Sequence, residues 1–393
     1  NVSKINGPLH IFNNRLSIVG VNKEIELPMR SADGSHLLSF NGEIYNYKKL
    51  RQQLILKGCR FTSETDTEVL YNGLLSSGIN YLKHLDGMWG FAFIDQNKKN
   101  IYLSRDVLGE KPLYYYIGKK ELIFCSEVAP IIAIMKDNPE WNYDAIVCSF
   151  QYRSAPPGET LIKGIKRLHG GETLTINYKY SHVSSSFHKK INVEKWKWFF
   201  DKKPSIEEVM ELYNQEISAS CSLRFPSEVG FVTTLSGGID STLINLMLSK
   251  YSSHNLHAIH GTSSLISPKR GNDLSEIEAA RFTAKKLGID LTEFFMYDKD
   301  ALVIHEQEAS DCFDGIFCEG AASFRILAKK ARELGKKVLV LSDGPDELLN
   351  GYDVDLHTNK IAKRMQNFSD EKKKCIQELS FKRSSWLGKS QGM

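Results

Sequence analysis

Eight residues near the middle of the chain have the types and the spacing of a phosphate-binding loop. The stretch Leu235-Ser236-Gly237-Gly238-Ile239-Asp240-Ser241-Thr242 follows an apolar run at 229–234 and precedes a segment with helical spacing. A strand, a Ser-Gly-Gly turn and a helix start direct backbone N–H groups toward an anion. Asp240 places a carboxylate beside that anion, which requires a divalent cation between them. The loop therefore predicts a nucleotide bound with Mg²⁺.

The loop has two other possible interpretations. A Gly-rich turn that only ends a core strand is the plain structural alternative. The GxxxxGK[ST] loop of P-loop NTPases does not apply, because no Lys follows the glycines. The loop instead resembles the pyrophosphate loop of N-type ATP pyrophosphatases, which adenylate a substrate and release pyrophosphate.

A second candidate site follows the apolar run at 338–341. Ser342-Asp343-Gly344-Pro345-Asp346-Glu347 contains three acidic residues within five positions. Like charges so close repel one another unless a cation compensates them. Asp240 and Asp346 are therefore the candidate Mg²⁺ ligands, with water and phosphate oxygens completing the coordination. A solvated acidic loop is the alternative.

The N-terminal part holds a third set of chemically capable residues. Arg15 can clamp a carboxylate, and Asp66 can hold an ammonium group. The amide of Asn41 beside the N–H of Gly42 can form an oxyanion hole. These groups suit the binding of a free amino acid and hydrolysis of its side-chain amide. The plain alternatives are a turn at Asn41-Gly42 and a helix cap at Thr65 or Asp66.

The elements that must position these residues differ between the two parts of the chain. In the first third, short apolar strands alternate with helical patterns, which predicts a layered α+β domain. The expected strands are 37–40, 90–94, 101–104, 113–117 and 122–125, and the expected helices are 47–57 and 67–77. We expect a first domain over 1–150, connecting structure over 151–205 and a second domain over 206–393.

From residue 206, helical patterns alternate with continuous apolar strands. The expected helices are 206–223, 241–251, 275–287 and 321–334, and the expected strands are 229–235, 256–260 and 338–341. This order predicts a parallel, doubly wound α/β sheet, which binds ligands at the carboxyl ends of its strands. Both Leu235-Ser236 and Leu341-Ser342 come at such ends.

Composition excludes several classes of protein. The 393 residues are 41% hydrophobic and 25% charged, as in ordinary globular proteins. A net charge of +4 is too small to favour a nucleic-acid partner, and no apolar run is long enough to span a membrane. Seven cysteines without a CxxC pair indicate reduced thiols. We therefore expect a cytoplasmic protein without nucleic-acid or membrane partners.

Taken in order, these motifs resemble the glutamine-hydrolysing asparagine synthetase family. The resemblance is carried by Arg-Leu-Ser-Ile at 15–18, Asn-Gly-Glu-Ile-Tyr-Asn at 41–46, Asp-Thr-Glu at 66–68, Arg-Asp-Val-Leu-Gly-Glu-Lys-Pro-Leu-Tyr-Tyr at 105–115, Ser-Glu at 126–127, the Leu-Ser-Gly-Gly-Ile-Asp-Ser loop and Asp-Glu-Leu-x-x-Gly-Tyr at 346–352. It implies a class II glutamine amidotransferase domain, an N-terminal nucleophile hydrolase-type four-layer αββα sandwich. An ATP-pyrophosphatase synthetase domain is expected to follow.

The resemblance also implies roles for single residues. The implied glutamine-binding residues are Arg15, Leu16, Ser17, Ile18, Val19, Asn41, Gly42, Glu43 and Asp66, with Asn41 and Gly42 as the catalytic oxyanion hole. The implied ATP-binding residues are Leu235, Ser236, Gly237, Gly238, Asp240, Ser241, His260, Leu341 and Ser342. Asp343 corresponds to an acid near the adenylated carboxylate. The run at 105–116 is expected to be mainly structural.

The implied reaction is an ATP- and Mg²⁺-dependent amide synthesis that uses glutamine as nitrogen donor. Aspartate is the default acceptor, and a sugar acid or a peptide carboxylate is the alternative with the same chemistry. A non-catalytic ATP-binding relative is the alternative from another class. A homodimer is compatible with the resemblance.

The sequence departs from the family pattern in three places. The family's nucleophile is an N-terminal cysteine, whereas residue 1 is Asn and the first cysteine is Cys59. Only some forty residues follow Tyr352. We expect the chain to be incomplete at both ends, and a true loss of glutaminase activity is the alternative for the missing cysteine. Leu341 and Ser342 replace a hydroxyl residue and a glycine, and Asn350 replaces a glycine. These changes leave the identity of the acceptor open.

Overall fold

The computed structural model describes the chain with gaps at residues 1–2, 6–8, 22–24, 119–120, 153, 180–181, 189–192, 227, 253–254, 263–272, 297–302, 305, 308–312, 314–318 and 346–393. The chain divides into two compact units, Asn1–Val340 and Leu341–Met393. The first unit contains both of the sheet systems that the sequence predicts.

Antiparallel strands build the N-terminal half of the first unit. A six-stranded sheet has the order β11 (His182–Phe187), β10 (Glu172–Asn177), β6 (Asn100–Arg105), β5 (Gly87–Asp95), β4 (His36–Ile44) and β3 (Met29–Arg30). A three-stranded sheet has the order β8 (Leu122–Cys125), β7 (Tyr114–Ile117) and β9 (Ile165–Arg167). A short pair is formed by β1 (Ser3–Ile5) and β2 (Leu9–Ile11).

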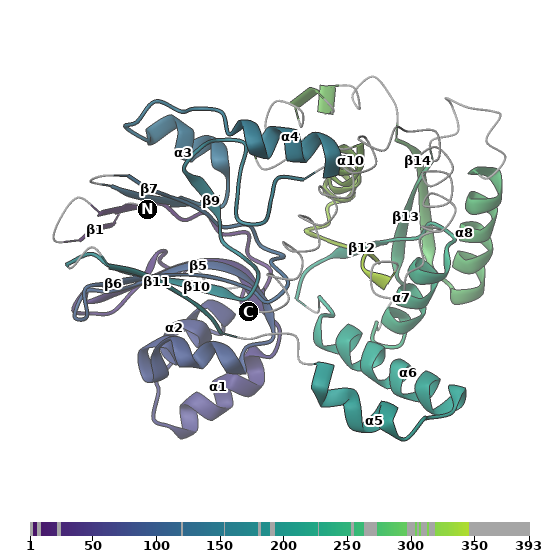
Figure 1. The fold of residues 1–393 in the computed structure, drawn as a ribbon. Coiled ribbons are helices and arrows are strands. Elements are labelled where there is room, and N and C mark those ends of the chain that lie inside the picture. Colours follow the sequence, from purple (N-terminus) through teal and green to yellow (C-terminus); the bar gives the residue numbers. More distant parts are fainter. Residues whose placement is uncertain are drawn as a thin grey trace. The chain divides into compact units, whose positions relative to one another are not determined.

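Helices cover the outer faces of the two sheets. These are α1 (Tyr47–Leu56), α2 (Asp66–Ser77) and the 3₁₀ helix η1 (Gly78–His84) on one side, and α3 (Val128–Ile134) and α4 (Tyr143–Tyr152) on the other. Figure 1 shows the resulting layers in the order helices, sheet, sheet, helices. The predicted αββα sandwich is therefore confirmed.

The strand sequences explain why both faces of the six-stranded sheet are covered. In β4, Leu38 packs in the core under α1 and α2, whereas its neighbour Leu37 packs in the core between the two sheets. In β5, Phe91 packs in the core under α1 and α2, and Ile94 packs in the core between the two sheets. Successive side chains of a strand point to opposite faces, so a continuous apolar run requires cover on both sides.

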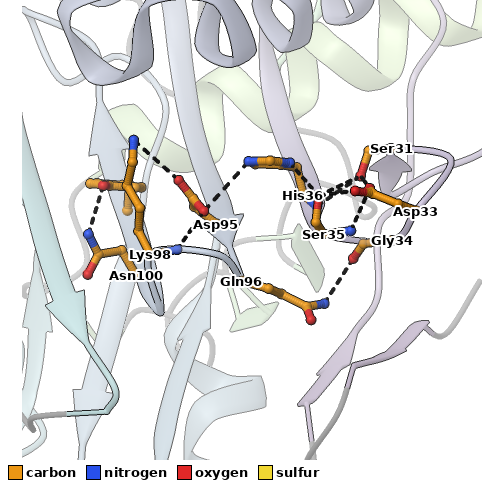
Figure 2. A network of polar contacts seen from close by, with 10 residues as sticks. Ser31, Asp33, Gly34, Ser35, His36, Asp95, Gln96, Lys98 and Asn100 are labelled. Atoms are coloured by element: carbon orange, nitrogen blue, oxygen red, sulfur yellow. Dashed lines mark hydrogen bonds and ion pairs between the residues drawn. The ribbon is translucent and has the colours of Figure 1, made fainter.

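Polar contacts join two adjacent turns at one end of this sheet (Figure 2). The His36 Nε2 atom lies 3.6 Å from Asp95 Oδ1, across the register that pairs these two residues in β4 and β5. The His36 Nδ1 atom lies 2.8 Å from the Ser35 hydroxyl, and Asp33 accepts hydrogen bonds within the β3–β4 turn. Lys98 Nζ lies 3.5 Å from Asp95 Oδ2. These contacts hold the register of β4 against β5.

Residues 151–205 differ from the expected connecting structure. Strand β10 pairs with β6, and β11 pairs with β10, so this stretch completes the six-stranded sheet. Strand β9 likewise pairs with β7. Of the residues that indicated a linker, Pro156-Pro157-Gly158 and Gly170-Gly171 lie outside the strands, whereas Ser184–Ser186 lie within β11. The helices η2 (Val193–Trp196) and α5 (Lys197–Asp201) then lead to the next half. The domain boundaries at 150 and 205 stay predictions.

A parallel sheet forms the rest of the first unit, as the sequence predicts. Its order is β14 (Asp290–Phe295), β13 (His257–Thr262), β12 (Phe231–Thr234) and β15 (Val338–Val340). The helices of this half are α6 (Ile206–Leu223), α7 (Ile239–Ser249), α8 (Asp273–Leu287) and α10 (Glu319–Glu333). Apolar residues of α6, α7 and α8 pack in one core, and those of α10 pack in a separate core with Val232 and Ile259. The sheet is therefore wound on both faces.

The strand order identifies where this sheet binds ligands. The chain runs outward from β12 through β13 to β14, and then returns to the other side of β12 with β15. The order reverses between β12 and β15, and doubly wound sheets bind ligands outside the carboxyl ends of the strands at such a reversal. The loop at 235–241 follows β12 directly.

Two further findings concern the described residues alone. None of the helices described is both long and apolar enough to cross a bilayer. Four cysteines in the described ranges, at positions 59, 125, 148 and 221, are free.

Candidate functional site

Three segments that are distant in sequence, together with Met88 and Lys111, line one small cavity in the N-terminal half. The cavity has a volume of about 100 Å³, well below the roughly 300–1,000 Å³ of sites for drug-sized ligands. Its size suits a ligand no larger than an amino acid. The lining residues are Asn14, Arg15, Leu16, Ile18, Val19, Phe40, Asn41, Gly42, Glu43, Asp66, Thr67, Met88 and Lys111. Every residue of the expected glutamine set except Ser17 is among them.

Arg15 organises the first of these segments. Its Nη1 donates to the Ser17 hydroxyl at 2.9 Å, and its Nη2 donates to the Val19 carbonyl oxygen. Ser17 does not line the cavity, but it holds the guanidinium that does. An Arg with a fixed orientation can bind a planar carboxylate with two parallel hydrogen bonds. The segment therefore presents a preformed cation to the cavity.

Asp66 enters the cavity from the first turn of α2. Thr65 caps this helix, since its hydroxyl accepts the Glu68 N–H at 3.2 Å. The Asp66 carboxylate accepts the Ile44 N–H at 3.0 Å and the Thr67 N–H at 2.9 Å. Burial raises the pKa of Asp66 to about 6 despite these bonds. The carboxyl is thus fixed in place and ready to bind a cationic group.

The Asn41-Gly42 pair does not form the turn that was its plain structural alternative. Strand β4 does not stop at Phe40 but continues to Ile44, with Gly42 opposite Trp89 of β5. A Cβ atom on Gly42 would lie only 2.1 Å from the Met88 carbonyl oxygen. The glycine is therefore required by the close approach of β5. The side-chain amide of Asn41 donates to the Ser126 hydroxyl at 3.4 Å.

Glu43 and Lys111 complete the charges around the cavity. Burial and the nearby charge of Asp66 raise the pKa of Glu43 to about 7, and Lys111 opposes this rise. Lys111 was expected to belong to a structural run and not to the site. The loop after β6 places Lys111 in a half-buried position beside Glu43.

That loop is held by its first two residues, Arg105 and Asp106. The buried Asp106 carboxylate accepts four backbone N–H groups, those of Trp89, Leu108, Glu110 and Lys111. Arg105 donates to the carbonyl oxygens of Lys111 and Leu168, each at 2.7 Å. Only the tertiary position of the loop identifies Lys111 as a cavity residue, because nothing in the motif distinguishes it from a surface lysine.

The predicted phosphate loop lies between β12 and α7 in the parallel-sheet half. Its first residue, Leu235, is fully buried, and its carbonyl oxygen lies 2.8 Å from Nδ1 of the buried His260. Ser241 is also buried, and its hydroxyl accepts the Ser236 N–H at 3.2 Å and lies 2.9 Å from the Ser236 hydroxyl. Contacts of the nucleotide with Ser241 and with the backbone of His260 stay predictions. In the structure their side chains bind the loop itself.

The exposed part of the loop fits a phosphate. Gly237 has a φ of +89°, and a Cβ atom there would lie 2.5 Å from the Glu276 carbonyl oxygen of α8. Gly238 is the N-cap of α7, and the first N–H groups of a helix have no partner within it. Asp240 lies half-buried in the first turn of α7. A backbone cradle with one carboxylate beside it suits a phosphate and Mg²⁺.

The remaining expected residues lie at or beyond the end of β15. Leu341 and Ser342 directly follow this strand and are half-buried, and Asp343 is exposed. Asp346, the second expected Mg²⁺ ligand, lies outside the described residues. Across the described ranges, no group of three or more His, Cys, Asp or Glu side chains is arranged to hold a metal ion.

Comparison with known proteins assigns a family description to each half. A family model described as a glutamine amidotransferase domain matches residues 5–187. A model described as asparagine synthase matches residues 213–390. The first match includes the strands at 165–187, in agreement with their place in the N-terminal sheets.

Curated relatives cover most of this chain. Asparagine synthetase [glutamine-hydrolyzing] 1 of Bacillus subtilis is 29% identical over 346 residues, which is 86% of this chain and 51% of that protein. Asparagine synthetase [glutamine-hydrolyzing] 2 of Arabidopsis thaliana is 25% identical over 94% of this chain and 57% of its own length. Amidase chry2 of Gibberella zeae is 25% identical over 86% of this chain and 50% of its own length. The chain spans about half the length of these relatives.

Proposed function

Because the chain belongs to the glutamine-hydrolysing asparagine synthetase family, we propose that the protein is an ATP-dependent amide ligase that takes its nitrogen from glutamine. Aspartate is the proposed acceptor, and asparagine the product. One observation supports the glutamine half most directly: residues 15–16, 18–19 and 41–43 and Asp66 line one cavity of amino-acid size. The ATP half is supported by a glycine loop where the strand order of the parallel sheet reverses.

The cavity residues have complementary tasks in glutamine binding. Arg15 would pair with the α-carboxylate and Asp66 with the α-ammonium group, so that the side-chain amide points toward Asn41 and Gly42. The Asn41 amide and the Gly42 N–H would stabilise the oxyanion that forms when the amide carbon is attacked. Water supplies the new carboxylate oxygen, and cleavage of the C–N bond yields glutamate and ammonia.

The loop after β12 would hold the triphosphate during activation of the acceptor. A carboxylate oxygen of the acceptor attacks the α-phosphorus, the bond to the bridging oxygen breaks, and pyrophosphate leaves. Backbone N–H groups at the start of α7 would bind that pyrophosphate. Mg²⁺, when bound, neutralises phosphate charge, and Asp240 is the residue that would hold it. Ammonia then attacks the acyl carbon, loses a proton, and displaces AMP to leave the amide.

Exchange of labelled pyrophosphate into ATP tests this activity. We expect exchange that depends on aspartate and is lost in Asp240→Ala. Asp290→Ala is the matched control, since it removes an exposed carboxylate at the start of β14. Exchange supported by a sugar acid or a peptide carboxylate instead of aspartate would change the acceptor and keep the chemistry. Binding of ATP without exchange with any carboxylate would contradict the proposal.

A further inference from the structure

The chain between α6 and β12 contacts the N-terminal half of the same compact unit. Arg224 Nη2 lies 3.0 Å from Asp86 Oδ1, and its guanidinium lies 4.7 Å from the centre of the Tyr45 ring. Both members of this ion pair are exposed, so the pair adds little stability by itself. The two contacts show that this segment lies against Tyr45 and Asp86 of the N-terminal half.

Glu228, four residues further on, makes the more specific contact. Its Oε2 accepts the Gly20 N–H at 2.7 Å, and its Oε1 accepts the Tyr47 hydroxyl at 3.0 Å. Gly20 directly follows Val19, the end of the segment at 15–19 that lines the small cavity. One carboxylate thus joins the end of this segment to the start of α1.

Gly20 has little freedom on its other side. It has a φ of +65°, and a Cβ atom there would lie 2.6 Å from Cγ2 of Thr65, the cap of the helix that carries Asp66. The backbone at Gly20 therefore lies between Thr65 and the Glu228 carboxylate. Since Arg15 donates to Val19, a shift at Gly20 would also move the guanidinium in the cavity.

Glu228 also affects the cavity through its charge. Glu43 lines both the small cavity and a second cavity of about 500 Å³, which Glu228 lines as well. After burial and the charge of Asp66, the charge of Glu228 further raises the pKa of Glu43, whereas Lys111 lowers it. The charged groups that act on Glu43 are thus Asp66 from α2, Lys111 from the loop after β6, and Glu228.

We propose that Glu228 is a positioning residue for the glutamine site, which it serves by holding residues 15–19 in place through the Gly20 N–H. This inference rests on the proposal that the small cavity binds glutamine. Glu228 lies just before β12, and the phosphate loop directly follows that strand. One end of this short strand therefore adjoins the residue that contacts the glutamine site, and the other end adjoins the ATP site.

Three variants separate the geometry of Glu228 from its charge. Glu228→Gln keeps the length of the side chain and removes the charge. Glu228→Asp keeps the charge and shortens the reach by one methylene. Glu216→Gln is the control, since it removes an exposed charge from α6. Each variant is examined by thermal unfolding, by hydrogen exchange at Gly20 and by calorimetric titration with glutamine between pH 5.5 and 8.5.

The proposal predicts a different result for each variant. In Glu228→Asp, glutamine binding weakens about tenfold, as for loss of a hydrogen bond to a charged group, and the pH midpoint of binding is unchanged. In Glu228→Gln, the pH midpoint moves to lower pH, because Glu43 ionises more easily without the neighbouring charge. In both, the Gly20 amide exchanges faster. Glu216→Gln behaves as the unaltered protein.

Two contrary outcomes can be told apart. If the unaltered protein binds glutamine, and both Glu228 variants match Glu216→Gln in affinity, pH midpoint and Gly20 exchange, the positioning role is wrong and the proposed function stands. If the unaltered protein binds no glutamine, the assignment of the cavity fails, and the role of Glu228 fails with it.

Discussion

Glu43 and Asp66 place two carboxyl groups in the same small cavity, and the charge of Asp66 adds to the burial that raises the pKa of Glu43 to about 7. The pKa of Asp66 is itself raised to about 6. Without a ligand, the cavity therefore retains protons near neutral pH. A ligand with an ammonium group favours the ionised carboxylates and releases these protons.

Glutamine binding should consequently strengthen as the pH rises. Both carboxyl groups are charged above about pH 7. Below about pH 6, each carboxyl group that becomes protonated weakens glutamine binding by up to roughly tenfold per pH unit. Titrations at pH 5.5 and 8.0 measure this change. Glu43→Gln should bind more weakly and show a flatter dependence between pH 6 and 8. An affinity independent of pH over this range would contradict a role for these carboxyls.

The same raised pKa of Asp66 predicts a pH dependence of stability in the ligand-free protein. The folded state binds more protons than the unfolded state between about pH 4 and pH 6, so the free energy of unfolding falls as the pH rises through this window. A difference of about two units between the pKa of Asp66 in the folded and the unfolded state corresponds to a change of about 3 kcal/mol in the free energy of unfolding. Urea unfolding at pH 4.5 and 7 should show this loss in the unaltered protein and a smaller one in Asp66→Asn. An equal loss in both would contradict the assigned pKa.

Arg15 should be the largest single contributor to glutamine affinity. Replacement by Ala removes the guanidinium that faces the cavity and frees the Val19 carbonyl oxygen. Loss of a hydrogen bond to a charged group costs about 1.5–3 kcal/mol, which corresponds to a roughly 10- to 150-fold weaker Kd. Calorimetric titration measures the change. Arg30→Ala, which removes an exposed arginine elsewhere in this half, serves as the control, and equal affinities in the two variants would remove Arg15 from the site.

Gly237→Ala should abolish nucleotide binding and leave the fold intact. The φ of +89° is unfavourable for alanine, and its Cβ would meet the Glu276 carbonyl oxygen of α8 at 2.5 Å. Such strain costs about 1–3 kcal/mol, and the loop must move to relieve it. Fluorescent ATP titration and thermal unfolding measure the two effects. Gly335→Ala also has a positive φ but open space around it, so it should lose stability without losing ATP binding.

Asp106→Ala should destabilise the N-terminal half by about 3 kcal/mol or more. The substitution leaves four backbone N–H groups without their shared acceptor, and buried unpaired donors cost about 1–3 kcal/mol each. Glutamine affinity should fall as well, because the loop also positions Lys111. Chemical unfolding with a parallel glutamine titration tests both statements. A stable variant would show that Arg105 alone holds the loop.

The phosphate loop at 235–241 and the helix start that presents Asp66 could be predicted from the sequence, because each depends on neighbouring residues in the chain. A glycine-rich turn before an amphipathic helix directs N–H groups outward wherever it lies, as at Gly238. The helix start at Asp66 is likewise set by Thr65, a neighbour in sequence. The apolar runs of β4 and β5 and the alternation after residue 206 were sufficient to predict both fold classes.

Apart from the glutamine set that the family resemblance implied, the sequence did not show which distant residues meet. The Asn41-Gly42 pair reads as a turn, yet it lies inside β4 because the backbone of Met88 requires a glycine opposite. Residues 165–187 were interpreted as part of a linker over 151–205, because the Pro, Gly and Ser residues of that stretch outweighed its short strands of three to six residues. The loop held by Asp106 determines that Lys111 belongs to the cavity.

The sequence by itself therefore determined the chemical types of the groups and the local turns and helix starts that present them, because those depend on neighbours in the chain. Tertiary structure decided which of these groups share a cavity. The contact between Glu228 and Gly20 joins residues 208 positions apart, and no local pattern marks either of them. Such contacts arise from the packing of whole sheets and helices, whose combined burial energy determines positions that no short segment specifies alone.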